Sequence, residues 1–410
     1  MNDYKVPAGW RWAKVGQVLE ATQYGLNLLA SSDGNTPIVG MKDLTDGRVS
    51  GANLSRVSIS EVDAARYLLR EGDILLNRTN SPDLVGKIGY VEGSLHAVFA
   101  SYLVRLKSNR SLIDPKFLAF WLSSPQGQEE IRPLATRGVS QANINPTAFC
   151  RRVPVPLPPL SEQRRIADIL ATWDRAIDTC EAMAAAKSKQ ARWLRWDIAT
   201  GAIKSTTWRK FQLREILVEH GLLSTGEEEV FSVSVHRGLV NQVEHLGRSF
   251  SASKTHHYNR VLSGDIVYTK SPTGDFPYGI VKHNSNPQSV IVSPLYGVFT
   301  PLIHSIGTIL DFLFESPEFA QNYLAPLIQK GAKNTINITN KRFLEGSALL
   351  PTEAVAQENL AAVIKTVQAE RLHINQLTDA LRRERDALAS ELLTGRLRVG
   401  EAARLAVAAG

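Results

Sequence analysis

The chain has 410 residues, of which 43% are hydrophobic and 21% are charged, and its net charge is +7. This length is enough for two domains with ordinary hydrophobic cores. The N-terminus lacks the apolar segment of a secretion signal, and no run of eighteen apolar residues occurs, which predicts a soluble, cytoplasmic protein. The two cysteines, Cys150 and Cys180, are too few for a disulfide framework or a four-ligand zinc site.

An internal duplication runs through the chain, and its matching segments keep their order. The matches are Trp10-Arg11 with Trp208-Arg209, Gly72-Asp73-Ile74 with Gly264-Asp265-Ile266, Asn143-Ile144 with Asn337-Ile338, Gln163 with Gln357, and Thr200-Gly201 with Thr394-Gly395. All are separated by 192 to 198 residues. The chain is therefore expected to contain two copies of one unit, each a globular part followed by a helix.

Each globular part is followed by a segment with the heptad spacing of a coiled coil. The first segment begins after the prolines of VPVPLPP, which cannot continue a helix, and both segments end at a glycine, Gly201 or Gly395. We call the positions expected to face the partner helix the seam. The first predicted seam is Ile166, Leu170, Trp173, Ile177, Cys180, Ala184, Lys187, Ala191, Leu194 and Ile198. The second is Leu360, Val363, Val367, Glu370, Ile374, Leu377, Leu381, Glu384, Leu388 and Glu391.

The predicted fold is α+β, because short β-branched runs broken by Gly, Pro and Asn indicate a twisted, mainly antiparallel sheet with helices in each globular part. Neither long helix can bury its apolar stripe alone, so we expect an antiparallel pair of helices and a pseudo-twofold relation between the copies. The predicted segments are an N-terminal domain 1–157, a central helix 158–204, a C-terminal domain 205–351, a distal helix 352–400 and a tail 401–410.

Several stretches resemble the specificity subunit of type I restriction-modification systems: PLPPLSEQRRIADIL, GDILLNRTNSPDLVGKIGYV, IATGAIK and LLTGRLRV. The second helix start, PTEAVAQENL, departs from the pattern PPLSEQRRI. The resemblance implies two target-recognition domains that each read half of a bipartite double-stranded DNA site. It also implies helices that dock adenine methyltransferase subunits, joined by a nuclease and translocase subunit. S-adenosylmethionine, ATP and Mg would then belong to the partner subunits, with no cofactor in this chain. The candidate partner contacts are Arg164, Arg165, Trp173 and Ile177.

The sequence lacks the common motifs for nucleotide binding and for zinc-dependent catalysis. It contains no GxxxxGK[ST], GxGxxG or HExxH pattern, so no phosphate cradle and no zinc motif is predicted. Asp83, Asp114 and Lys116 fit the loose spacing of a PD-type nuclease, but that pattern is so permissive that chance is the better explanation. We therefore expect a non-catalytic subunit.

Candidate DNA contacts come from polar, basic segments that occur in both copies, because Arg, Lys, Asn and Gln read base edges while Ser and Thr bind phosphates. A predicted hairpin tip supplies Arg78, Thr79, Asn80, Ser81 and Lys87, and its counterpart supplies Tyr268, Lys270, Ser271, Thr273 and Lys282. A glycine-containing loop supplies Arg137, Ser140 and Gln141, and its counterpart supplies Lys330, Lys333 and Asn334. Ordinary solvated loops are the alternative in each case.

A helix of roughly 37 residues is about 55 Å long, so we expect half-site centres about one helical turn of DNA apart, with roughly 16 base pairs as an upper limit. Two other functions stay open. The chain could be a free-standing DNA-binding regulator, or a coiled-coil scaffold whose duplicated domains bind ligands other than DNA.

Overall fold

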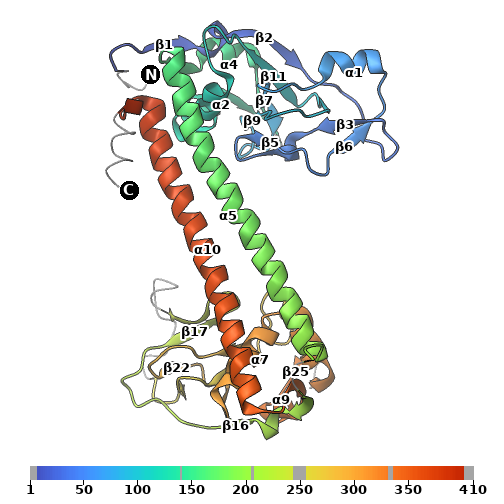
Figure 1. Ribbon diagram of the computed structural model, residues 1–410, viewed down its shortest axis with the longest axis vertical. Coiled ribbons are helices and arrows are strands. Elements are labelled where there is room, and N and C mark those ends of the chain that lie inside the picture. Colours follow the sequence, from blue (N-terminus) through green and yellow to red (C-terminus); the bar gives the residue numbers. More distant parts are fainter. Residues whose placement is uncertain (1–6, 139–140, 205–206, 243–254, 331–335, 401–410) are drawn as a thin grey trace. The chain divides into compact units, whose positions relative to one another are not determined.

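The computed structural model describes residues 7–138, 141–204, 207–242, 255–330 and 336–400. Packing divides the chain into two compact units (Figure 1). The first unit is Met1–Thr179 with Leu377–Gly410, and the second is Cys180–Gln376. The two long helices, α5 (Leu160–Thr200) and α10 (Ala354–Thr394), therefore each contribute residues to both units. No helix within the described ranges is long and apolar enough to cross a membrane.

The first unit is built on a six-stranded sheet in the order β2-β11-β7-β9-β5-β4. Smaller sheets join β10-β3-β6, β12-β13-β8 and β1-β14. The strands are β1 (Arg11–Lys14), β2 (Leu19–Tyr24), β3 (Thr36–Val39), β4 (Leu44–Thr45), β5 (Arg48–Val49), β6 (Ser55–Val57), β7 (Ile74–Asn77), β8 (Thr79–Asn80), β9 (Ile88–Tyr90), β10 (Val98–Phe99), β11 (Leu103–Ser108), β12 (Ala135–Arg137), β13 (Ala142–Ile144) and β14 (Pro154–Leu157). The shorter helices are α1 (Glu61–Tyr67), α2 (Pro115–Ser123), α3 (Pro125–Ile131) and α4 (Pro146–Arg152).

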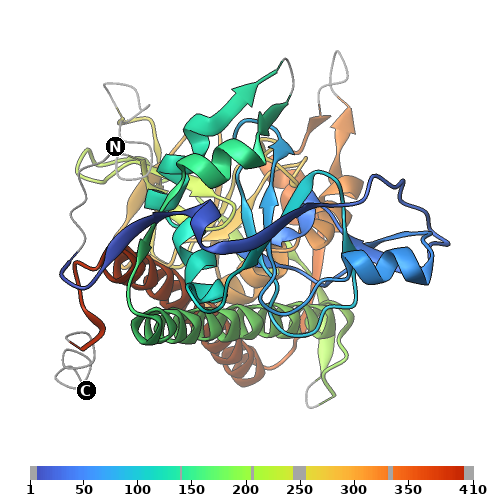
Figure 2. The same ribbon diagram turned by 90° about the horizontal axis from the view of Figure 1, so that it is seen from above.

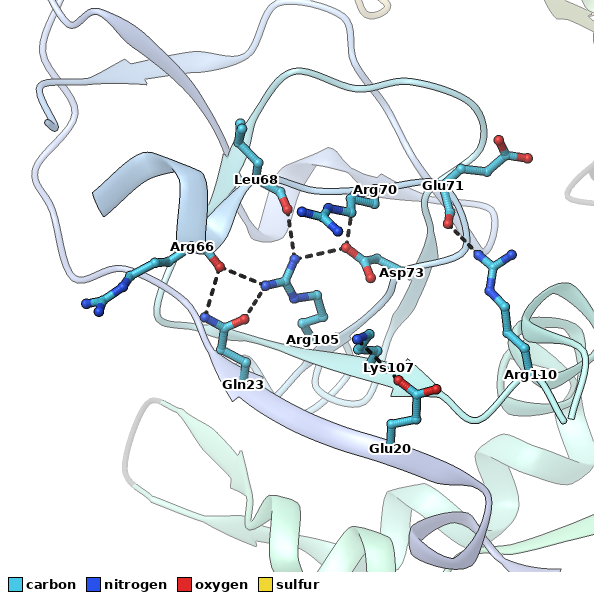
Figure 3. A network of polar contacts seen from close by, with 10 residues as sticks. All are labelled: Glu20, Gln23, Arg66, Leu68, Arg70, Glu71, Asp73, Arg105, Lys107 and Arg110. Carbon is cyan, nitrogen blue, oxygen red and sulfur yellow. Dashed lines mark hydrogen bonds and ion pairs between the residues drawn. The ribbon is translucent and has the colours of Figure 1, made fainter. Parts of the chain in front are cut away.

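A buried polar network fixes the edge of this sheet (Figure 3). Arg105 on β11 donates to the carboxylate of Asp73 at 3.0 Å, to two backbone carbonyls before β7, and to the side chain of Gln23 on β2. Asp73 also accepts the backbone N–H of Arg70 at 2.9 Å. A buried carboxylate is stable only when its charge is paired and hydrogen-bonded, so this network holds β2, β7 and β11 in one arrangement.

The second unit repeats the central part of this plan in the four-stranded sheet β16-β23-β20-β21. Strand pairs β15-β26, β17-β18, β19-β22 and β24-β25 complete its described strands. The strands are β15 (Trp208–Gln212), β16 (Leu217–Glu219), β17 (Phe231–Ser234), β18 (Gly238–Asn241), β19 (Asn259–Val261), β20 (Ile266–Tyr268), β21 (Val281–His283), β22 (Val290–Val292), β23 (Gly297–Pro301), β24 (Gln329–Lys330), β25 (Ile336–Asn337) and β26 (Ser347–Pro351). The helices are α7 (His304–Phe314), α8 (Pro317–Leu324) and α9 (Asn340–Glu345).

The duplication predicted from sequence is present in the backbone hydrogen bonds. Gly72 has φ +88° and donates to Val91 at 3.0 Å, and Gly264 has φ +92° and donates to Asn284 at 2.9 Å. Both positions need a backbone conformation that glycine adopts without strain. The α+β class with mainly antiparallel sheets and two long helices packed together is confirmed.

The predicted seam of α5 is confirmed, because its ten positions are all buried or half-buried. The predicted seam of α10 is wrong at alternate positions. Val363 and Leu377 are 50% and 42% exposed, whereas the helix buries the next residue in each case, Ile364 and Thr378. The observed seam is Leu360, Ile364, Val367, Arg371, Ile374, Thr378, Leu381, Arg385, Leu388 and Leu392. The observed seam contains Arg371, Thr378 and Arg385, and the apolar residues Val363 and Leu377 favoured the wrong spacing.

Charged side chains at or beside the seams are paired within each unit. In the first unit Arg385 contacts Asp174 at 2.9 Å. In the second, Lys187 and Glu370, which interrupt the two predicted apolar patterns, form an ion pair at 2.6 Å. Each pair joins α5 to α10, so the polar interruptions match one another across the helix pair.

The start of α5 is tied to the first unit by two side chains of the SEQ motif. Gln163 is fully buried, donates to Pro158 and accepts the backbone N–H of Asp114, both at 2.8 Å. Glu162 accepts from the indole of Trp10 at 3.0 Å and from the guanidinium of Arg398 at 2.8 and 3.0 Å. One carboxylate therefore joins the first strand region, the start of α5 and the segment after α10.

The glycine that follows each long helix lies beside the tryptophan at the start of a repeat. A Cβ added to Gly201, at φ +67°, would lie 3.4 Å from Trp208. A Cβ added to Gly395, at φ +73°, would lie 2.6 Å from Pro7 and 3.2 Å from Trp10. The end of α10 thus supports the first repeat as the end of α5 supports the second.

Replacing Glu162 with glutamine should destabilise the first unit by about 1–3 kcal/mol, because the neutral amide loses its charge-assisted bonds to Arg398. Urea unfolding of the full chain measures this change. The control is Glu358→Gln on the exposed face of α10, which should change the free energy of unfolding by less than about 0.5 kcal/mol. Equal effects of the two variants would contradict the role of Glu162.

Burial lowers the pKa of His283 in the second unit to about 4, and the nearby His304 and Lys365 act in the same direction against Asp265. An unfolded histidine titrates near 6.5, so between these pH values the unfolded chain binds more protons than the folded chain. The free energy of unfolding should therefore be about 2 kcal/mol lower at pH 5 than at pH 7.

The variant His283→Asn should lose most of this pH dependence, and His236→Asn, at an exposed position, should keep it. Urea unfolding at a series of pH values provides the measurement. A His283→Asn variant with the unmodified protein's pH dependence would show that another group is responsible.

Candidate nucleic-acid interface

Two of the predicted contact segments meet in the first unit. Strands β7 and β9 form the expected hairpin, with Leu76 opposite Ile88. Between them, β8 leaves the hairpin and pairs with β13, so that Asn80 lies opposite Ala142 and Thr79 opposite Asn143. This pairing makes the predicted hairpin tip at residues 78–81 a neighbour of β13, the strand that follows the predicted loop. The β12–β13 hairpin stands out from the body of its unit (Figure 2).

Arg78 occupies the junction between β7 and β8. Its backbone N–H donates to Tyr102 at 3.0 Å and its carbonyl accepts from Ile144 at 2.8 Å. Its guanidinium carbon lies 5.4 Å from the centre of the Tyr24 ring. The Nε atom is buried and has no hydrogen-bond partner among the described residues. Tyr24 and Tyr102 are 53% and 44% exposed and were missed in the sequence, where an isolated aromatic residue carries no signal.

Thr79 is buried, so it is not itself a contact, which corrects the prediction. Its hydroxyl donates to the side-chain oxygen of Asn143 at 2.6 Å. Asn143 is exposed, and this bond fixes its amide. Asn143 is not among the contacts predicted from the sequence, and the adjacent Ile144 is fully buried.

The other candidates of the first unit lie at or near the surface. Asn80 and Ser81 are half-buried, and Lys87 and Gln141 are exposed. Arg137 lies at the end of β12. Ser140 lies outside the described residues.

In the second unit, Lys270 follows β20 at the position that matches Arg78, since 192 residues separate both this pair and the pair Gly72 and Gly264. Lys270 is half-buried and has φ +61°, a left-handed conformation that costs a side-chain-bearing residue roughly 1–2 kcal/mol. Burial lowers its pKa, against the opposing effect of Glu219. Ser271 and Thr273 are exposed on the turn that follows.

Two candidates of the second unit are structural, and their prediction was wrong. Tyr268 is fully buried, stacks on Phe343 with ring centres 4.7 Å apart, and donates its hydroxyl to the carbonyl of Tyr278. Lys282 is 6% exposed and lies 3.7 Å from the carboxylate of Asp311. All three residues of β20 and the first two of β21 are buried, so both faces of this hairpin are covered, which the polar composition of the segment did not reveal.

The remaining loop candidates are only partly described. Lys330 ends strand β24, which pairs with β25. Lys333 and Asn334 lie outside the described residues.

The candidate partner contacts on α5 differ in exposure. Arg164 and Arg165 are exposed and Trp173 is half-buried. Ile177 is 8% exposed within the helix seam, so its assignment as a contact was wrong.

Two tryptophans missed in the sequence are more prominent on α5. Trp193 and Trp196 are 58% and 55% exposed. They line an open groove of the second unit together with Arg192, Glu318 and Phe319. Exposed tryptophans beside a groove are typical of protein interfaces.

The described residues contain no group of three or more side chains arranged to hold a metal ion. Asp114 and Lys116, from the nuclease-like spacing, have structural contacts instead. Asp114 caps α2 by accepting the backbone N–H groups of Lys116 and Phe117, and Lys116 pairs with Glu92 at 2.6 Å.

This architecture is that of a protein with two related α+β units connected by paired long helices, and comparisons with known proteins agree. Residues 7–185 match the type I restriction modification DNA specificity domain. The chain is 26% identical over 278 residues to the putative type I restriction enzyme MjaX specificity subunit of Methanocaldococcus jannaschii, covering 65% of this chain and 64% of that protein. It is 24% identical over 298 residues to the type I restriction enzyme EcoKI specificity subunit of Escherichia coli K12, covering 66% and 63%.

The crystal structure of the type I restriction-modification system S subunit from M. genitalium has the same fold, with a TM-score of 0.63 at 12% identity, over 96% of this chain and 98% of that one. The chain is therefore similar to type I restriction-modification specificity subunits in sequence, and it shares the fold of a solved S subunit. Its alignments span slightly less than two thirds of the length of these curated relatives.

Proposed function

We propose that this chain selects the DNA target of a type I restriction-modification complex, with each unit reading one half of a bipartite double-stranded site. The observation that carries the proposal is the repeat of one scaffold with different side chains at its exposed strand ends. Arg78 and Asn143 lie at this place in the first unit, and Lys270, Ser271 and Thr273 lie there in the second. Two units of one fold with different contact residues would read two different half-sites.

The chain contributes recognition, and its partners contribute chemistry. Methyltransferase subunits would bind S-adenosylmethionine and methylate adenine, and a restriction and translocase subunit would use ATP and Mg. We place the docking of the methyltransferase on exposed faces of α5, at Arg164 and Arg165 and at the groove beside Trp193 and Trp196. A complex that acts on DNA inside the cell would lie in the cytoplasm.

Selection from a random duplex library tests this function, using the full chain purified with its adenine methyltransferase and sequencing of the retained DNA. The expected result is two short, different half-sites separated by a fixed gap. Raising the salt concentration should weaken binding steeply, because cationic side chains displace counterions from phosphates.

Other results would favour the two alternatives. Tight, specific binding of one contiguous site by the isolated chain would identify a free-standing regulator. An intact complex that enriches no sequence and whose DNA binding depends little on salt would contradict DNA recognition and favour a scaffold that binds other ligands.

A further inference from the structure

Arg78 and Lys270 differ from the other shielded cations in the part of the chain that the structure describes. Arg105, Arg195 and Lys282 are each paired with a carboxylate. Among the described residues, the side chains of Arg78 and Lys270 form neither a hydrogen bond nor an ion pair. The lost hydration of these half-buried cations is offset only by the Tyr24 ring for Arg78 and by the charge of Glu219 for Lys270, so a ligand with hydrogen-bond acceptors would stabilise both.

The two cations share one position of the repeat. In each unit the cation follows a buried polar residue at the end of the central hairpin strand: Asn77 is the last residue of β7, and Thr269 directly follows β20. These polar residues donate their backbone N–H to the residue just before the opposite strand, Asn77 to Lys87 at 2.8 Å and Thr269 to Ile280 at 3.0 Å. The same backbone hydrogen bond therefore precedes a partly desolvated cation in both units, although only Lys270 has a left-handed backbone conformation.

Each cation is held by its surroundings. In the first unit, stacking on Tyr24 and burial of Nε leave the terminal amino groups of Arg78 as the donors that can reach outward. In the second, Lys270 keeps its left-handed conformation, and a Cβ on the neighbouring Gly279 would lie 2.8 Å from its backbone nitrogen. Backbone strain of this kind persists only where the structure or a ligand requires it.

We propose that Arg78 and Lys270 are the specificity-determining residues of their units and that each donates hydrogen bonds to the major-groove edge of a guanine. This inference rests on the proposed DNA recognition. Guanine presents two adjacent acceptors, N7 and O6, and arginine or lysine is their usual donor. A held guanidinium offers the fixed direction that base reading needs, whereas phosphate binding needs only charge.

The test compares variants of the complete complex by the same random-duplex selection. Arg78→Ala should lose the preference for guanine at one position of one half-site by roughly ten- to hundredfold, and should leave the other half-site unchanged. Lys270→Ala should give the converse result. Lys42→Ala, at an exposed lysine of the first unit, should leave both half-sites unchanged.

A substitution that retains a planar hydrogen-bonding group provides a second readout. Glutamine pairs with the N6 and N7 atoms of adenine, so Arg78→Gln should shift the preferred base at that position from guanine to adenine. Thermal unfolding of each variant shows whether it is folded, and retention of the unaffected half-site confirms this in the same experiment.

Two results separate failure of this inference from failure of the proposed function. Uniform weakening at all sequences, with a smaller salt dependence and unchanged base preferences, would make the cations phosphate contacts and overturn the inference alone. If the unmodified complex enriches no pair of half-sites, DNA recognition fails and the inference fails with it.

Discussion

The contact on which the structure depends most is the packing of a helix-ending glycine against the tryptophan that starts a repeat. Gly201 and Trp208 form it in the second unit, and Gly395 and Trp10 form it in the first. The second contact joins segments nearly 400 residues apart, and Glu162 reinforces it by binding both Trp10 and Arg398. The first unit therefore requires the last helix. The helix that ends the second repeat packs against the start of the first repeat.

The scaffold is repeated while its side chains diverge. Buried Asp73 is satisfied by Arg105, whereas buried Asp265 is satisfied by His220 at 2.9 Å and Thr300 at 2.7 Å. The backbone bonds of the two glycines that precede these aspartates are nevertheless the same. Because the backbone is fixed by bonds that do not depend on side-chain identity, positions at the strand ends such as those of Arg78 and Lys270 are free to differ. This independence is what a protein that reads many targets with one fold needs.

The sequence predicted features that depend on spacing and failed where orientation mattered. The duplication, the α5 seam, the helix-ending glycines and the β7–β9 hairpin follow from local patterns, and the structure confirms them. The α10 seam was misplaced because the observed seam contains polar residues, among them Arg371 and Arg385, whose partners Glu315 and Asp174 are distant in sequence, while the apolar Val363 and Leu377 lie outside it. The same limitation placed Tyr268 and Lys282 at the surface, and it concealed the pairing of Thr79 with Asn143.

The central claim is that one chain reads two half-sites whose separation its long helices determine. Inserting one heptad at matching positions of α5 and α10 tests it most directly, because seven helical residues add about 10 Å, or roughly three base pairs. Random-duplex selection should then return the same two half-sites with a gap about three base pairs longer. The same half-sites with an unchanged gap would contradict the account.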